Sequence, residues 1–258
     1  MQRAADIAAE APKRWRREHG DLGIPWDDAE GHLAIIIDDS GRELHQFDQL
    51  LSLRFPLTFA VLPGSVFAAG TQVRLQVDTR RYRDILLHLP MEPLETAQMQ
   101  DGAEADETFL LVDDGPQTIR NKTAAALAQV PTAIGVNNHM GSRLTADRPA
   151  MQAVMAELHG RGLFFLDSRT SAETVAADVA AEAGLRAGSR HIFLDHEPGL
   201  EAISAALEQA AVRARVEPTV VIAHPSTEVV QVLRERLPQL HADGIAVYPL
   251  SQLLADHS

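Results

Sequence analysis

The chain has 258 residues, of which 45% are hydrophobic, and it carries 36 acidic against 23 basic side chains, a formal net charge of -13. This hydrophobic content is enough to bury the core of one large domain, while the acidic balance disfavours nucleic acid and anionic membranes as partners. The absence of cysteine excludes disulfides, thiolate zinc sites and cysteine nucleophiles, and no apolar run reaches the roughly 18 residues of a membrane span.

An N-terminal arm, residues 1–31, is predicted to precede a domain of residues 32–258. Within this domain, short hydrophobic runs alternate with stretches of helical periodicity. The runs predict strands at 33–38, 57–62, 84–89, 132–137, 163–166, 191–194, 219–223 and 244–248. The periodic stretches predict helices at 43–53, 66–81, 117–129, 147–161, 171–184, 199–215 and 226–240.

This alternation is typical of an α/β fold with a parallel sheet and right-handed crossovers. Seven or eight such units favour a closed (β/α) barrel over an open sheet. Residues 92–116, with Pro93, Gly102, an acidic cluster and Gly115, form the longest connection. They predict an insertion after the third strand, and long loops of this kind often line a substrate site.

Four of the predicted strands lead into an acid or a histidine: Asp38-Asp39, His88, His139 and His224. Because the carboxyl ends of parallel strands meet at one edge of a sheet, these side chains are expected to lie together and to form a metal centre with acid–base partners. Neighbouring strand residues point to different sides, so one aspartate can hold the metal while the other acts as a base. Taken alone, the aspartate pair fits a helix N-cap equally well.

Further polar residues accompany the same strands. Glu92 stands four residues after His88 and is an alternative metal ligand. The next polar segment is too rich in functional side chains for a simple turn, and its members are expected to contact the ligand, stabilise an oxyanion or support the centre: Asn137, Asn138, Ser142 and Arg143. The ends of two later strands carry Asp167, Ser168, Arg169 and Asp195. These residues are expected either to orient the site or to form contacts at its rim, and Asp167 is expected to pair with Arg169.

Six segments in a fixed order over residues 32–250 carry a family resemblance. They are Ile35-Ile36-Ile37-Asp38-Asp39, Leu87-His88-Leu89-Pro90-Met91-Glu92-Pro93, Gly135-Val136-Asn137-Asn138-His139-Met140-Gly141-Ser142-Arg143, Leu163-Phe164-Phe165-Leu166-Asp167-Ser168-Arg169, Phe193-Leu194-Asp195 and Ala223-His224-Pro225. On these segments the chain resembles the divergent (YibQ-like) polysaccharide deacetylases, a distant branch of the NodB-type carbohydrate deacetylases.

The resemblance implies a distorted (β/α) barrel, usually with seven strands, and a divalent metal, usually zinc. It also implies that Asp38 is the catalytic base, that Asp39 is a metal ligand and that His224 is the general acid.

The third metal ligand departs from the family pattern. NodB-type enzymes have His-x-x-x-His in the second motif, whereas this chain has His88 followed by Glu92. His88 remains a ligand by resemblance. His139 is favoured over Glu92 as the third ligand, because neighbouring strand ends close around one point in a barrel.

The expected activity is metal-assisted hydrolysis of an N- or O-acetyl group on a polysaccharide or peptidoglycan-type glycan. The replaced histidine leaves a rival hypothesis, a catalytically inactive barrel that binds metal or glycan in the cell envelope. An amidohydrolase is disfavoured, because those enzymes usually begin with His-x-His on the first strand. The resemblance suggests a periplasmic or secreted protein; the sequence leaves a cytoplasmic location and the oligomeric state open.

Overall fold

The computed structural model describes residues 23–95, 97, 99 and 108–255. Its strands are β1 (Gly31–Ser40), β2 (Thr58–Val61), β3 (Ile85–Met91), β4 (Gly135–Met140), β5 (Phe164–Asp167), β6 (Ala187–Ser189), β7 (Ile192–Phe193), β8 (Thr219–Ala223) and β9 (Ile245–Val247). Its α-helices are α2 (His45–Leu51), α3 (Ala68–Val77), α5 (Gly115–Gln129), α6 (Arg148–His159), α7 (Ala176–Glu182), α8 (Leu200–Ala214), α9 (Thr227–Ala242) and α10 (Leu250–Leu253). Short 3-10 helices are η1 (Trp26–Asp28), η2 (Val112–Asp114) and η3 (Leu144–Ala146). Residues 1–22 of the predicted arm and Gly102 of the insertion lie outside the described residues.

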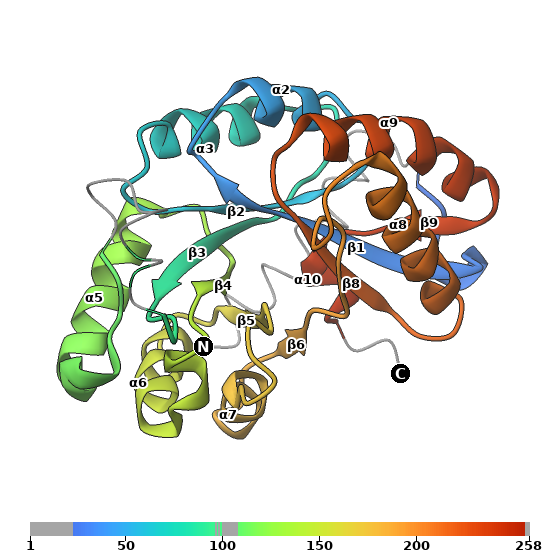
Figure 1. Ribbon diagram of the computed structural model, residues 1–258. Helices are drawn as coiled ribbons and strands as arrows, with labels where there is room; N and C mark the ends of the chain where they lie inside the picture. Colours follow the sequence, from blue (N-terminus) through green and yellow to red (C-terminus); the bar gives the residue numbers. More distant parts are fainter. Residues whose placement is uncertain (1–22, 96, 98, 100–107, 256–258) are drawn as a thin grey trace.

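The described strands form one parallel sheet in the order β6-β5-β4-β3-β2-β1-β8-β7, and β9 pairs with the beginning of β1. The sheet curls, and its longer helices lie around the outside, whereas the short α10 lies on the inner side (Figure 1). The two end strands, β6 and β7, follow each other in the chain, but no pairing between them occurs in the described part. The expected distorted (β/α) barrel of seven or eight mostly parallel strands is therefore confirmed, whereas full closure, expected from the number of repeats, is not found among the described strands.

Alternation along β1 separates two apolar layers. Leu33, Ile35 and Ile37 belong to the large cluster that includes the surrounding helices. Ala34 and Ile36 belong to a smaller cluster with residues of β2, β3, β5, β8 and α10, which fills the inside of the curl. Because successive strand residues point to opposite faces, the inner row of each strand leads from this core toward the carboxyl edge of the sheet.

The strands depart most clearly from the predictions at β4 and β6. β4 was expected to end at residue 137 but extends to Met140, where its residues pair with β3 as far as Met91. The polar segment Asn137 to His139 therefore lies on the strand itself. β6 was not predicted, because Ala187-Gly188-Ser189 has no hydrophobic run; it exists through pairing with β5.

Side-chain caps fix the beginnings of two helices. Asp147 Oδ1 accepts a hydrogen bond of 2.8 Å from the Ala150 N–H at the beginning of α6. Ser226 Oγ accepts one of 3.1 Å from the Val229 N–H at the beginning of α9. Each cap satisfies an N–H group that has no partner within its own helix. The chain thus leaves β8 and turns at once into α9, directly after His224.

Gly135, the first residue of β4, lies so close to Phe164 that it leaves no space for a side chain. A Cβ atom at Gly135 would lie 2.3 Å from Cε2 of Phe164, which is buried in the inner cluster. We therefore expect Gly135→Ala to lower the free energy of unfolding by about 1–3 kcal/mol, the usual cost of overpacking a filled core.

Urea unfolding followed by circular dichroism measures this effect, with Gly70→Ala as the matched control. Gly70 lies in α3, and a Cβ atom there meets nothing within 4 Å. The control is expected to gain about 0.5–1 kcal/mol from its better helix propensity. A Gly135→Ala protein as stable as the wild type would contradict the steric argument.

Candidate metal centre and active site

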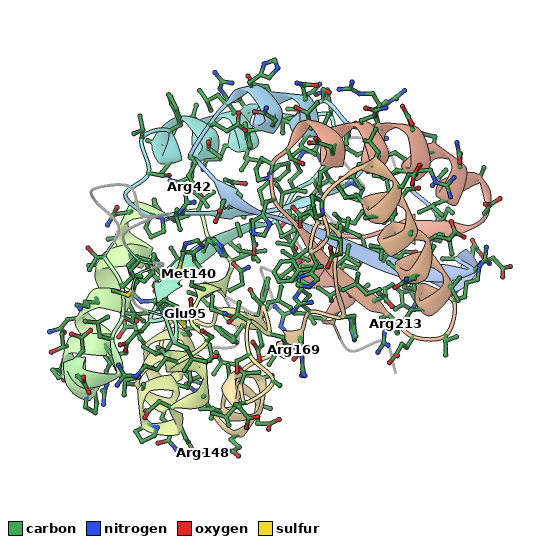
Figure 2. All side chains as sticks on the ribbon, in the orientation of Figure 1. Arg42, Glu95, Met140, Arg148, Arg169 and Arg213 are labelled. Atoms are coloured by element: carbon green, nitrogen blue, oxygen red, sulfur yellow. The ribbon has the colours of Figure 1, made fainter. Side chains whose placement is uncertain are left out.

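The inner rows of four strands change from apolar to polar as they approach the carboxyl edge. Ile36 is followed by Asp38 on β1, Leu86 by His88 on β3, and Ile222 by His224 after β8, while β4 contributes Asn137 and His139. The strand ends thus bring together the five side chains that the sequence singled out (Asp38, Asp39, His88, His139 and His224). Figure 2 shows Arg42, which follows β1, and Met140, the last residue of β4, in the left half of the view.

Asp39 reaches the site through an irregularity of β1. Strict alternation would direct it away from the face that carries Asp38. The pairing of β1 with β2 shifts register between Ile37 and Ser40, and Asp39 adopts a left-handed backbone conformation with φ of 51°. Bulges of this kind re-aim side chains beside functional sites. The irregularity places both aspartates at one centre.

Three potential ligand atoms lie together in this centre. Asp39 Oδ1 is 3.3 Å from His88 Nε2 and 3.1 Å from His139 Nδ1. The two imidazole nitrogens are 3.1 Å apart. The ligand atoms of a tetrahedral zinc ion, with bonds of about 2.0–2.1 Å, are separated by about 3.3–3.4 Å.

The donor set also fits a metal chemically. Asp39 Oδ1 is a buried acceptor that receives no hydrogen bond of acceptable geometry, although both imidazoles are close. Burial by itself raises the pKa of Asp39, but His139 and His88 outweigh this effect and hold that pKa below its ordinary value. The side chain is therefore a carboxylate, the form that binds cations. Two imidazoles and one carboxylate resemble the three protein ligands of catalytic zinc sites.

Asp38 lies beside this trio without being part of it. Its Oδ2 is 3.6 Å from His88 Nε2, and its Oδ1 accepts a 2.8 Å hydrogen bond from Asn137 Nδ2. Burial raises the pKa of Asp38, and His88, His224 and Asn137 oppose that rise. A buried carboxyl group whose pKa is raised is suited to taking up a proton.

His224 forms the opposite side of the site. Its Nδ1 lies 3.2 Å from Asp195 Oδ2, and its backbone N–H donates a 2.8 Å hydrogen bond to the same oxygen. Its ring stacks on Phe193 at a centroid distance of 5.6 Å, and the Arg190 guanidinium lies 3.9 Å above Phe193. Burial lowers the pKa of His224, but Asp195 and Asp38 more than offset this effect and raise it to about 9. With this pKa the imidazole is protonated at neutral pH, and its side chain is 43% exposed and therefore accessible.

Glu92 and its neighbours instead organise the insertion. The Glu92 carboxylate accepts hydrogen bonds from the Arg143 guanidinium and from the Val112 N–H. Ser142 Oγ accepts a 2.9 Å hydrogen bond from the Leu94 N–H. Glu92 is therefore engaged at the base of the insertion and is not among the three grouped ligand atoms.

Comparison with known proteins agrees with this architecture. Residues 35–254 match the model of the divergent polysaccharide deacetylase family. The chain belongs to this family. An uncharacterized protein of Haemophilus influenzae Rd is 35% identical over 217 residues, which are 83% of this chain and 74% of the relative. The uncharacterized protein YibQ of Escherichia coli K12 is 34% identical over 225 residues, which are 87% of this chain and 67% of YibQ.

A solved structure shows the same fold. The uncharacterized protein ATU2773 from Agrobacterium tumefaciens C58 superposes with a TM-score of 0.78 at 23% identity, covering 93% of this chain and 94% of that one. Among the described helices of this deacetylase family member, none has the length and apolar character needed to cross a bilayer.

The other residues that the sequence predicted for the site connect the ends of β4 and β5. Asn138 Nδ2 donates a 2.7 Å hydrogen bond to the Met140 carbonyl, and its Oδ1 accepts one of 2.8 Å from the Ser168 N–H. Asp167 accepts 2.8 Å from the Arg169 N–H and 2.9 Å from Thr174 Oγ1. The contact between Asp167 and Arg169 is thus made by the backbone N–H of Arg169, and the predicted ion pair of their side chains is not found among the described residues.

Two arginines near the site were not recognised from the sequence. Arg42 Nη1 lies 3.3 Å from Asp39 Oδ2, and Arg42 Nη2 lies 3.4 Å from His139 Nε2. The one sequence feature that could have indicated a role for Arg42 in the site is its position directly after Asp39-Ser40-Gly41. Arg190 donates to the Ser168 and Arg169 carbonyls, between β5 and β7. No sequence pattern marks Arg190, because its contacts depend on how the two ends of the sheet meet.

Proposed function

We propose that this chain is a metal-dependent deacetylase that hydrolyses an N- or O-acetyl group on a polysaccharide or peptidoglycan-type glycan. The observation that carries the proposal is one group of three close ligand atoms, from Asp39, His88 and His139, flanked by a buried acid and a protonated histidine. Membership of the divergent polysaccharide deacetylase family supports the substrate class.

The metal would be held by Asp39, His88 and His139, and the nitrogen-rich donor set favours zinc. When bound, such an ion polarises an acyl oxygen and lowers the pKa of a bound water. The proposal assigns no ligand role to Glu92, because Arg143 and the Val112 N–H already engage its carboxylate.

Asp38 and His224 divide the proton transfers between them. Asp38 is ready to accept the proton of the attacking water, since burial raises its affinity for protons. His224 is charged and partly exposed, so it can give a proton to the departing amine or alkoxide. Asp195 fixes the His224 ring through Nδ1, which leaves Nε2 as the atom that donates.

The proposed substrate also bears on location. Acetylated envelope glycans lie outside the cytoplasm, and a periplasmic or secreted site of action follows from that chemistry. We therefore propose a role in the cell envelope.

Acetate release tests the proposal. The protein, loaded with zinc or cobalt, is incubated with a panel of acetylated glycans that includes peptidoglycan fragments, N-acetylglucosamine oligomers and O-acetylated xylan. We expect acetate from at least one of them, and a loss of about 100- to 10,000-fold in Asp38→Asn, the usual contribution of a general base. Glycan binding without acetate release would favour the inactive, glycan-binding barrel instead.

A further inference from the structure

The buried side-chain amide of Asn137 contacts both the proposed metal ligand His88 and the proposed base Asp38. Asn137 Oδ1 lies 2.9 Å from His88 Nδ1, and Asn137 Nδ2 donates a 2.8 Å hydrogen bond to Asp38 Oδ1. The same Nδ2 is 3.2 Å from Ser168 Oγ. Asn137 is completely buried, as are nearly all atoms of Asp38 and His88. Water therefore does not substitute for these contacts.

The chemistry of the three groups fixes the direction of each bond. His88 Nε2 faces Asp39 and His139, so it must carry a lone pair when a metal is bound. His88 Nδ1 then carries the N–H, which donates a hydrogen bond to Asn137 Oδ1. The amide has one oxygen and one nitrogen, so its Nδ2 necessarily faces Asp38, which as a carboxylate only accepts.

The backbone makes this arrangement rigid. His88 and Asn137 are direct partners in the parallel pairing of β3 with β4. The Asn137 side chain thus spans from one strand to its neighbour and then to Asp38 on β1. A side chain of this length and polarity is required, because a hydrocarbon leaves two buried polar atoms without partners.

We infer that Asn137 is a positioning residue that holds the metal ligand His88 and the base Asp38 in one fixed relative orientation. The role toward Asp38 rests on the proposed hydrolysis, whereas the role toward His88 rests only on the proposed metal centre. It assigns the two ends of the amide to two separable tasks. The carbonyl end sets the His88 tautomer that binds metal, and the amino end orients the carboxylate of Asp38.

Two substitutions separate these tasks. Asn137→Asp keeps an acceptor for the His88 N–H but removes the donor to Asp38 and places a second carboxylate there. Asn137→Leu has similar size and removes both contacts. Asn121→Asp is the matched control for the added charge, because Asn121 is exposed on α5, where it contacts Gln117.

Zinc affinity is measured by competition with a chromophoric chelator, and the cobalt(II) absorption spectrum reports the ligand geometry. We expect Asn137→Leu to lose about 10- to 100-fold in zinc affinity, as is typical of residues that support a metal ligand. We expect Asn137→Asp and Asn121→Asp to stay near the wild type in zinc affinity and cobalt spectrum. Acetate release on the best glycan should fall in both Asn137 variants and remain in Asn121→Asp.

The outcomes distinguish the inference from the proposed function. Wild-type zinc affinity in Asn137→Leu would overturn the role toward His88, and wild-type acetate release in Asn137→Asp would overturn the role toward Asp38. If the wild type releases no acetate from any glycan, the proposed function and the role toward Asp38 both fail. The zinc measurements still decide the role toward His88 in that case. A thermal melt identifies a misfolded Asn137→Leu protein. In that case the nearly isosteric Asn137→Asp still tests the role toward Asp38, and Asn137→Ala, which also removes both contacts, repeats the zinc measurement for the role toward His88.

Discussion

Asp39→Asn is expected to abolish high-affinity zinc binding and, with it, acetate release. The substitution keeps the size of the side chain and, like aspartate, tolerates the left-handed backbone at this position, where φ is 51°. It removes the only negative charge among the three grouped ligand atoms. The loss of zinc affinity should exceed the roughly 100-fold upper range seen for supporting residues. Chelator competition and metal analysis of the purified protein measure it.

Asp39→Ala separates the lost ligand from backbone strain. Alanine in the left-handed region costs about 1–2 kcal/mol, so this variant should lose zinc as Asp39→Asn does and also unfold at a lower urea concentration. Asp28→Ala, at an exposed position in η1, controls for the loss of one acid. Zinc affinity within a few-fold of the wild type in Asp39→Asn would refute the proposed ligand set.

The pattern of strand ends predicted most of the fold because it depends on local sequence. Runs such as Val220-Val221-Ile222 are buried on both faces and are therefore continuously hydrophobic, which makes them easy to recognise. β6 lacks this signal, since Gly188 and its neighbours pair with β5 without a hydrophobic run. The opening between β6 and β7 also depends on geometry that no local pattern contains.

The candidate site was only partly predictable for a related reason. Residue types at strand ends predicted that Asp38, Asp39 and His88 would meet, and the family resemblance proposed their roles. The bulge that turns Asp39 toward the centre has no signature in the sequence, because two adjacent aspartates also fit a helix cap. Glu92 was a reasonable alternative ligand by spacing. Its contact with Arg143, 51 residues away in the chain, exists only in the folded protein.

Removing the charge of Asp195 is expected to shift the pH dependence of the reaction. In the wild type the pKa of His224 is raised to about 9, so a general acid is present at neutral pH and is lost as the pH rises through about 9. Asp195→Asn removes the hydrogen bond and one of the charges that oppose burial, while Asp38 and Asp39 remain, so this pKa should fall from about 9 toward its ordinary value of about 6.5. A complete return to 6.5 would lower the protonated fraction of His224 at pH 8 by about 30-fold, and any fall in this pKa moves the alkaline limb of the profile of kcat/KM to lower pH.

Two measurements test this shift. The pH profile of acetate release reports the shift in the loaded enzyme, and an NMR titration of the His224 ring reports it without catalysis.

The raised pKa of His224 also makes the stability of the protein depend on pH. A histidine whose pKa is raised by folding stabilises the protein below its unfolded pKa of about 6.5 and loses that contribution as the pH rises through about 9. Asp195→Asn should therefore flatten the decline in unfolding free energy between pH 6.5 and about 9.

An alkaline limb that stays in place in Asp195→Asn, but disappears in His224→Gln, would show that another group sets the His224 pKa. If neither variant alters the limb, His224 is not the proton donor.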